Sequence, residues 1–175
     1  YSFLASTDEW FSPVVAEVGP DGNMWVADWY NFIIQHNPTP NKEFGGYDAK
    51  RGLGNAHINT NRDRQHGRIY RVVYEDNNNK IQSLDGSKTK QLLNFLGDDN
   101  LFWRLTAQRL LVENKHFDAV PELEGIVNEG GKISIHALWT LHGLGALDEK
   151  ILTSALISKE AVLSRNAIRA LGTDI

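Results

Sequence analysis

The sequence predicts an α+β protein in which a short antiparallel β segment is followed by an α-α superhelix of about three helical repeats. Composition is the first reason, because all five tyrosines and three of the five tryptophans precede residue 80, whereas the remainder is rich in Leu, Ala and Ile at helical spacing. The second reason is that the second half repeats every 30 residues. A polar run at 75–80 marks the boundary, so we expect a β domain at 1–80 and a helical domain at 81–175.

Three strands are expected in the first half. A β-branched run at 14–18 is followed by the turn signal Gly19-Pro20-Asp21-Gly22 and by a second strand at 24–27. The third strand, at 68–74, comes after a long connection at 31–66 that is rich in Asn, Gly and Pro. Because three strands alone leave edges and a face exposed, we expect this sheet to belong to a larger β structure or to lean on the helices.

The 30-residue spacing predicts three helical pairs. Three triplets share one helical face, each four positions after the last: Trp103/Ile133/Leu163, Ala107/Ala137/Ala167 and Leu111/Leu141/Leu171. A further triplet, Leu96/Ile126/Leu156, belongs to the preceding helix of each pair. The pairs are expected at 88–97 with 100–113, at 117–128 with 132–143, and at 149–157 with 160–171. The pattern resembles HEAT repeats in a short form and predicts an α-solenoid.

Composition excludes several classes of protein. With 41% hydrophobic and 23% charged residues, the chain is neither disordered nor collagen-like. No apolar run approaches the roughly 18 residues that a membrane span requires. The lack of cysteine removes disulfides, thiolate zinc sites and cysteine nucleophiles. A net charge of -4 argues against a nucleic-acid partner.

A local basic patch is the main candidate site. Between Lys50 and Arg71 the chain holds six basic residues and a single acid, in spite of its overall negative charge. The candidate ligand-binding residues lie at the end of the second strand and at the approach to the third: Asp28, Trp29, Tyr30, His36, Arg62, Asp63, His66 and Arg68. Arginines there would bind carboxylates bidentately, beside an aromatic stacking platform.

Other interpretations of the same residues remain open. In a structural lock, Asp63 would pair with Arg68 or Arg71 and close the long loop without any ligand. A metal site would need the two histidines of the candidate set together with Asp28, but their wide separation gives no diagnostic spacing, and no metal is predicted. Glycoside hydrolysis would need two carboxylates flanking a cleft, for which Asp28 and Asp63 are candidates.

No catalytic residue can be assigned from the sequence. In the helical half, His136, His142 and Trp139 lie near the second-helix face, but no acid or nucleophile follows at a matching spacing. We therefore interpret them as packing or surface residues.

Two motifs resemble a known family. The stretch "AEVGPDGNMWVADWYN" resembles a propeller blade of NHL-repeat proteins and of soluble quinoprotein sugar dehydrogenases, where a PDG turn precedes such a strand. Its combination with the later "NRDRQHGRIYRVVY", followed by HEAT-like repeats, is similar to the large secreted or membrane-bound multidomain dehydrogenases of Bacteroidetes and Planctomycetes.

The resemblance implies a non-catalytic fragment of a secreted sugar-dehydrogenase-like oxidoreductase, periplasmic or at the cell surface. The β segment would be the last propeller blade, with upstream blades of the same chain as its partners, and the helices would be a spacer. The parent protein would use pyrroloquinoline quinone with calcium, with haem c on a separate domain, whereas this fragment would hold no cofactor. The alternative is an interaction module, in which the helical-repeat surface binds a protein partner.

Overall fold

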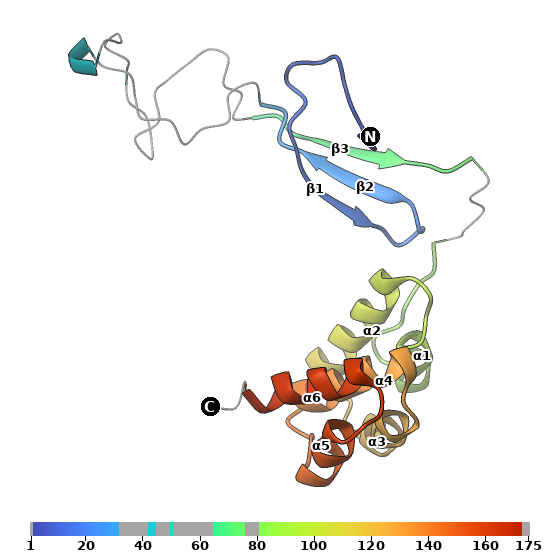
Figure 1. Ribbon diagram of the computed structural model, residues 1–175. Coiled ribbons are helices and arrows are strands. Elements are labelled where there is room, and N and C mark those ends of the chain that lie inside the picture. The colour runs from blue at the N-terminus through green and yellow to red at the C-terminus, as the bar shows by residue number, and fades with distance from the viewer. Residues whose placement is uncertain (1, 32–41, 45–49, 51–64, 76–80, 173–175) are drawn as a thin grey trace. The chain divides into compact units, whose positions relative to one another are not determined.

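The computed structural model describes residues 2–31, 42–44, 50, 65–75 and 81–172. The chain divides into two compact units, residues 1–19 with 23–77 and residues 20–22 with 78–175. Figure 1 shows a small sheet in the first unit and helices in the second. The predicted fold class, a short antiparallel β segment followed by helices, is confirmed. Of the predicted site residues, His36, Arg62 and Asp63 lie outside the described residues.

The first unit contains a three-stranded antiparallel sheet in the order β1-β2-β3. Its strands are β1 (Pro13–Val18), β2 (Met24–Asp28) and β3 (Arg68–Val72). The predicted turn joins β1 to β2: Gly22 has a φ of 73°, and the Gly19 N–H donates to the Asn23 carbonyl at 2.9 Å. Position 19 requires glycine because a Cβ there would lie 2.3 Å from Cδ1 of the Trp25 indole.

The two faces of the sheet differ in burial. On one face Val26 is 3% exposed, and its register partners are Ala16 and Tyr70. The Phe11 ring packs edge-on to Tyr70, with centroids 5.7 Å apart. On the other face Ile69 is 72% exposed. The residues of β1 are exposed on both faces. The described part of this unit therefore has a small apolar centre on one side of the sheet.

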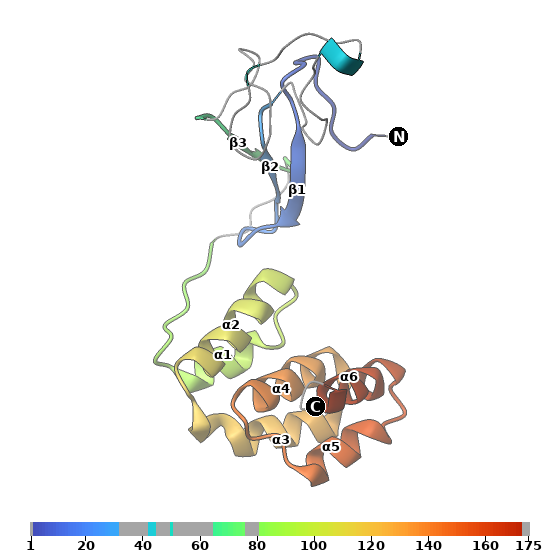
Figure 2. The same ribbon diagram turned by 90° about the vertical axis from the view of Figure 1, so that its left-hand side faces the viewer.

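The second unit contains six helices in three consecutive pairs. They are α1 (Thr89–Phe95), α2 (Leu101–Glu113), α3 (Val120–Glu129), α4 (Gly131–Gly143), α5 (Glu149–Leu156) and α6 (Ala161–Gly172). Each odd-numbered helix packs on the even-numbered helix that follows it, α3 also contacts α5, and α4 contacts both α2 and α6 (Figure 2). The second helices of the three pairs therefore form a row with α4 in the middle. The bounds lie close to those predicted from the 30-residue spacing.

The repeat positions form the helical core, with one exception. The alanines at the centre of the three second helices are all fully buried: Ala107, Ala137 and Ala167. Their small size allows neighbouring helices to approach closely. Leu111 and Leu141 are also fully buried, but Leu171 is 46% exposed, so the prediction was wrong at this position. Leu171 lies in the last turn of α6, where no further described helix covers it, and Ala170 is buried instead.

Candidate functional site

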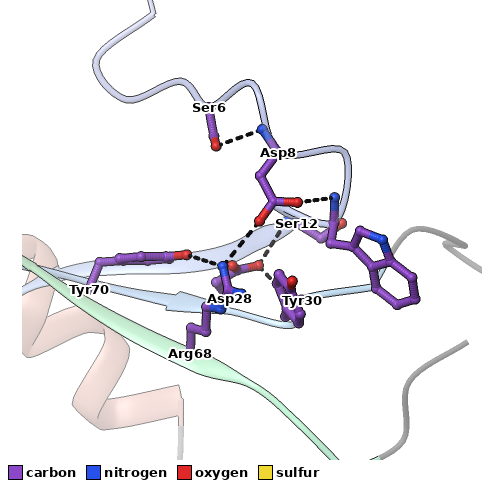
Figure 3. A network of polar contacts seen from close by, with 8 residues as sticks. Ser6, Asp8, Ser12, Asp28, Tyr30, Arg68 and Tyr70 are labelled. Atoms are coloured by element: carbon purple, nitrogen blue, oxygen red, sulfur yellow. Dashed lines mark hydrogen bonds and ion pairs between the residues drawn. The ribbon is translucent and has the colours of Figure 1, made fainter.

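Arg68 lies at the centre of the polar cluster shown in Figure 3. Its Nη1 donates to Oδ2 of Asp8 at 3.1 Å and to the hydroxyl of Tyr70 at 3.2 Å. Its guanidinium carbon lies 3.5 Å from the centroid of the Tyr30 ring, which is a cation–π contact. The hydrogen bond with Tyr70 raises the pKa of Arg68 above its ordinary value. This arginine is therefore engaged by three neighbours of its own unit.

Asp8 is held in place by the segment that precedes β1. The Asp8 N–H donates to the Ser6 hydroxyl oxygen at 3.0 Å, and Oδ1 of Asp8 accepts the Trp10 N–H at 3.0 Å. The Trp10 ring packs against Tyr30, with centroids 5.6 Å apart. Asp8 is thus an ion-pair partner of Arg68, and sequence reasoning missed it because no local pattern links residues 60 positions apart.

Tyr30 has an unusual backbone conformation. Its φ is 51°, in the left-handed region that side chains other than glycine rarely adopt. Its N–H donates to Oδ1 of Asp28 at 2.8 Å, and its ring contacts both Trp10 and Arg68. Strain of this kind is typical of positions that the surroundings fix on both sides.

Asp28, the last residue of β2, is a buried carboxylate with two different oxygens. Oδ1 accepts the N–H of Ser12 at 2.7 Å and that of Tyr30 at 2.8 Å, which joins the entry to β1 to the exit from β2. Oδ2 is buried and has no hydrogen-bond partner, the single such side-chain atom found among the described residues. Buried polar atoms are nearly always paired, so an unpaired one is unusual. Since Oδ2 has no partner, it is able to accept a hydrogen bond or to contact a cation.

The structure brings together part of the predicted site. Asp28 and Arg68 are register partners on β2 and β3, and the Tyr30 ring stacks on the guanidinium of Arg68, whereas the sequence led us to expect it as a platform for a ligand. Trp29 is half exposed, and His66 is exposed at the approach to β3. The carboxylate pair considered for glycoside hydrolysis cannot be assessed, because Asp63 lies outside the described residues.

A hydroxyl, an imidazole and a carboxylate also meet at the start of α1. Oγ1 of Thr89 donates to Oδ2 of Asp118 at 2.7 Å and lies 2.9 Å from Nδ1 of His116. Nε2 of His116 donates to the Gly86 carbonyl at 2.7 Å. Thr89 is the first residue of α1, and both of its partners belong to the segment at 116–118. The cluster therefore fastens α1 to the short 3₁₀ helix Phe117–Ala119.

A second candidate site is the outward side of α2, α4 and α6. On these helices, a residue two positions after a core residue lies about 200° around the helix, so its side chain points away from the core. Five core residues are followed in this way: Trp103, Ala107, Ala137, Leu163 and Ala167. We call the five residues that lie two positions after them the second-helix face: Leu105, Arg109, Trp139, Arg165 and Arg169. Leu105 is 50% exposed, the three arginines are exposed, and Trp139 is partly buried.

Charge is unequally divided between the two sets of helices. The second helices α2, α4 and α6 carry five Lys and Arg against one Glu, a net charge of +4. The first helices α1, α3 and α5 carry two Lys against four Glu, a net charge of -2. A chain with a net charge of -4 therefore presents one basic set of helices.

The partners of these basic groups differ along the face. Nε of Arg165 donates to the Ala161 carbonyl at 3.1 Å. Within the described part of the chain, neither Arg109 nor Arg169 has a side-chain hydrogen bond or an ion pair. Nε1 of Trp139 donates to Oδ1 of Asn166 on α6 at 2.9 Å, which fixes the orientation of the indole between α4 and α6.

His136 links α4 to α2 beside this face. Its Nε2 accepts from Nε of Arg104 at 3.2 Å, so the proton of the neutral ring is on Nδ1, which donates to Oε1 of Gln108 at 2.8 Å. Burial lowers the pKa of His136, and the positive charge of Arg104 lowers it further. Nη1 of Arg104 also donates to the carbonyls of Asp98 and Asp99. His136 is thus a packing residue at a helix contact, as interpreted from the sequence.

Two kinds of site are absent from the described residues. No group of three or more His, Asp or Glu side chains in these ranges is arranged to hold a metal ion. Among the helices that the structure describes, none combines the length and the apolar character that crossing a bilayer requires.

The fold and these sites define an α+β protein with a small antiparallel sheet and three helical pairs. Residues 1–76 match the family model described as "Domain of unknown function (DUF7133)", which covers less than half of the chain. No curated protein and no solved structure matches the chain.

Proposed function

We propose that this chain is a protein-interaction module, whose helical unit binds a protein partner through the second-helix face. The observation that supports this is the division of charge, which places four net positive charges on the second helices of an acidic chain. Lys132 is paired with Asp99, but Arg109 and Arg169 have no acid partner among the described residues, so their charges are available to a complementary molecule. The HEAT-like solenoid proposed from the repeat pattern would present these helices as one extended binding surface.

The residue types of the face support a protein partner. Trp and Arg are the residues most enriched among those that dominate the binding energy of protein interfaces. Trp139 and the three arginines of the face belong to these types, and Leu105 adds exposed apolar surface. In the first unit, by contrast, Arg68 is engaged by Asp8, Tyr70 and Tyr30, which supports the structural-lock interpretation for that residue.

The experiment is a selection of displayed random peptides on the complete chain, followed by binding measurements on variants. Trp139→Ala and Arg109→Ala alter the face, and Lys150→Ala, an exposed residue of α5, is the matched control. We expect selected peptides to lose affinity for the two face variants and to keep it for the control, with unchanged melting temperatures throughout. Peptides that bind all variants equally, or a selection that enriches none, would contradict the proposal.

We propose a second candidate function for the first unit, as part of one face of a propeller in a secreted sugar-dehydrogenase-like oxidoreductase. The observation that favours it is the buried and unpartnered Oδ2 of Asp28, close to Tyr30 and Arg68. A calcium ion or a hydroxyl of a bound molecule would satisfy this oxygen. Calorimetric titration of the full-length protein with pyrroloquinoline quinone and calcium tests it. Binding that is lost in Asp28→Asn at a temperature where the variant remains folded would support this function, and the absence of binding would contradict it.

A further inference from the structure

We infer that the second-helix face takes an acidic polypeptide segment in which one hydrophobic side chain is flanked on both sides by carboxylates. This inference rests on the proposed function of the helical unit and specifies its partner. Three features of the face carry it: the sign of its charge, the order of its residues, and the free groups that each residue offers.

The sign of the charge selects the partner. The second helices contain five basic side chains and one acid, Glu113, and one of the basic side chains, Lys132, is paired with Asp99. The four glutamates of the first helices repel an acidic segment from the other layer. At physiological salt, charges act over about 8 Å, so an approaching segment responds to the local positive face rather than to the net charge of the chain. Like charges brought together at an interface repel each other, which excludes basic partners.

The order of the residues gives the spacing. Arg109, Trp139 and Arg169 occupy the same position of the 30-residue repeat, and α4 lies between α2 and α6. Trp139 is therefore the middle member of a row with one arginine on each side. Packed helices lie about 8–10 Å apart, and an extended chain advances about 3.3 Å per residue. Carboxylates about three residues before and after a central hydrophobic residue would thus reach the two arginines together.

The groups available on each residue fit this segment. The guanidiniums of Arg109 and Arg169 are free of ion pairs within the described residues, and guanidinium matches carboxylate bidentately. The indole N–H of Trp139 is already bonded to Asn166, so the ring offers apolar surface rather than a hydrogen-bond donor. A central leucine or aromatic side chain is therefore preferred to a polar one.

A protein segment fits better than a membrane or a nucleic acid. Interfacial helices that lie on membranes carry a continuous apolar stripe, whereas three of the five residues of this face are arginines. Nucleic-acid binding needs a broad basic surface, and the complete chain has a net charge of -4. Both remain outcomes of the experiment.

The experiment measures binding of three labelled peptides to the complete chain by fluorescence anisotropy. The first peptide carries a leucine with a glutamate about three residues away on each side, the second has glutamines in place of both glutamates, and the third has alanine in place of the leucine. The variant Arg109→Ala/Arg169→Ala alters the face. Lys90→Ala/Lys150→Ala, on α1 and α5, removes the same charge from the first helices and is the matched control.

We expect the glutamate peptide to bind, with affinity falling as salt rises, and to bind about tenfold more tightly than either of the other peptides. The double arginine variant should lose about tenfold, while the lysine control should bind as the wild type does. Equal binding of glutamate and glutamine peptides, or an equal loss in the control, would overturn the inference. So would tighter binding of single-stranded RNA or of vesicles containing phosphatidylglycerol in competition with the peptide.

Failure of this inference differs from failure of the proposed function. If the displayed-peptide selection enriches segments that require Trp139 but lack acidic residues, the interaction module stands and the acidic partner is wrong. If no enriched segment depends on Trp139, the module itself is wrong.

Discussion

The guanidinium of Arg68 stacks on the ring of Tyr30, with its central carbon 3.5 Å from the ring centroid. Tyr30 follows the end of β2, and Arg68 is the first residue of β3. The stack therefore joins the point where the chain leaves one strand to the point where it enters the next. Asp8 and Tyr70 hold the same guanidinium, so the contact fixes three separate segments of the first unit.

Replacing Arg68 tests whether this contact is structural. Lysine keeps the positive charge, but it lacks the planar group that stacks on Tyr30 while donating to Asp8 and Tyr70. We expect both Arg68→Lys and Arg68→Ala to lower the melting temperature, with the larger decrease for alanine. Circular dichroism measures this, with Lys90→Ala as a surface control. An Arg68→Ala protein that melts like the wild type would remove the structural role.

Asp28 offers a test with two substitutions of the same residue. Asp28→Ala leaves the partly buried N–H groups of Ser12 and Tyr30 without their acceptor, and an unpaired group costs up to about 1–3 kcal/mol when it is fully buried. Asp28→Asn keeps one oxygen as acceptor, so we expect it to destabilise the protein less. Urea unfolding followed by tryptophan fluorescence gives both free energies of unfolding. Equal losses in the two variants would show that Oδ1 is not the stabilising acceptor.

Lys115 is expected to be a position where glycine stabilises the protein. It follows α2 with a φ of 55°, and the His116 N–H donates to the Leu111 carbonyl, which is the pattern of a helix C-terminus that favours glycine. Gly145, the equivalent residue one repeat later, has a φ of 67°. The Lys115 side chain is exposed, so Lys115→Gly should raise the free energy of unfolding by about 1 kcal/mol.

The control for this position is Lys115→Ala, which removes the same side chain but keeps the strained backbone. We expect alanine to leave the free energy of unfolding close to that of the wild type. Chemical denaturation of the three proteins under one condition separates the cases. A glycine variant no more stable than the alanine variant would show that the left-handed backbone carries no strain here.

The repeated local patterns of the sequence were enough to predict most of the fold. The 30-residue spacing located six helices and the buried alanines, because helix faces depend on residues three or four positions apart. The turn at 19–22 could be predicted because both of its glycines have a physical reason: Gly22 has a positive φ, and Gly19 leaves room for the Trp25 ring. Leu171 was misassigned because the burial of a side chain in the last turn of α6 depends on tertiary contacts that periodicity does not specify.

The candidate sites were harder to predict. Asp8 reaches Arg68 through tertiary structure alone, and nothing in the sequence marks it as a partner. The row of Arg109, Trp139 and Arg169 was present in the repeat, but its outward direction follows only from the burial of the residues two positions earlier. Charge on a helix has functional meaning only when its exposed side is known.

The stability of the α2–α4 contact is expected to depend on pH through His136. Burial and Arg104 lower the pKa of this imidazole in the folded protein, whereas the unfolded chain has the ordinary value of about 6.5. Below about pH 6.5 the unfolded chain therefore binds a proton that the folded protein does not bind. The stabilisation is complete above about pH 6.5 and is lost as the pH falls from there toward the lower pKa of the folded state.

Urea unfolding of wild type and His136→Gln at about pH 7.5 and about pH 5.5 checks this expectation. Glutamine keeps an acceptor for Arg104 but does not titrate, so the variant should lose less stability between the two pH values than the wild type. Asp99 does not interfere, because its hydrogen bond with Lys132 lowers its pKa further below this range. If His136→Gln retained the full pH dependence, another group would have to be responsible for it.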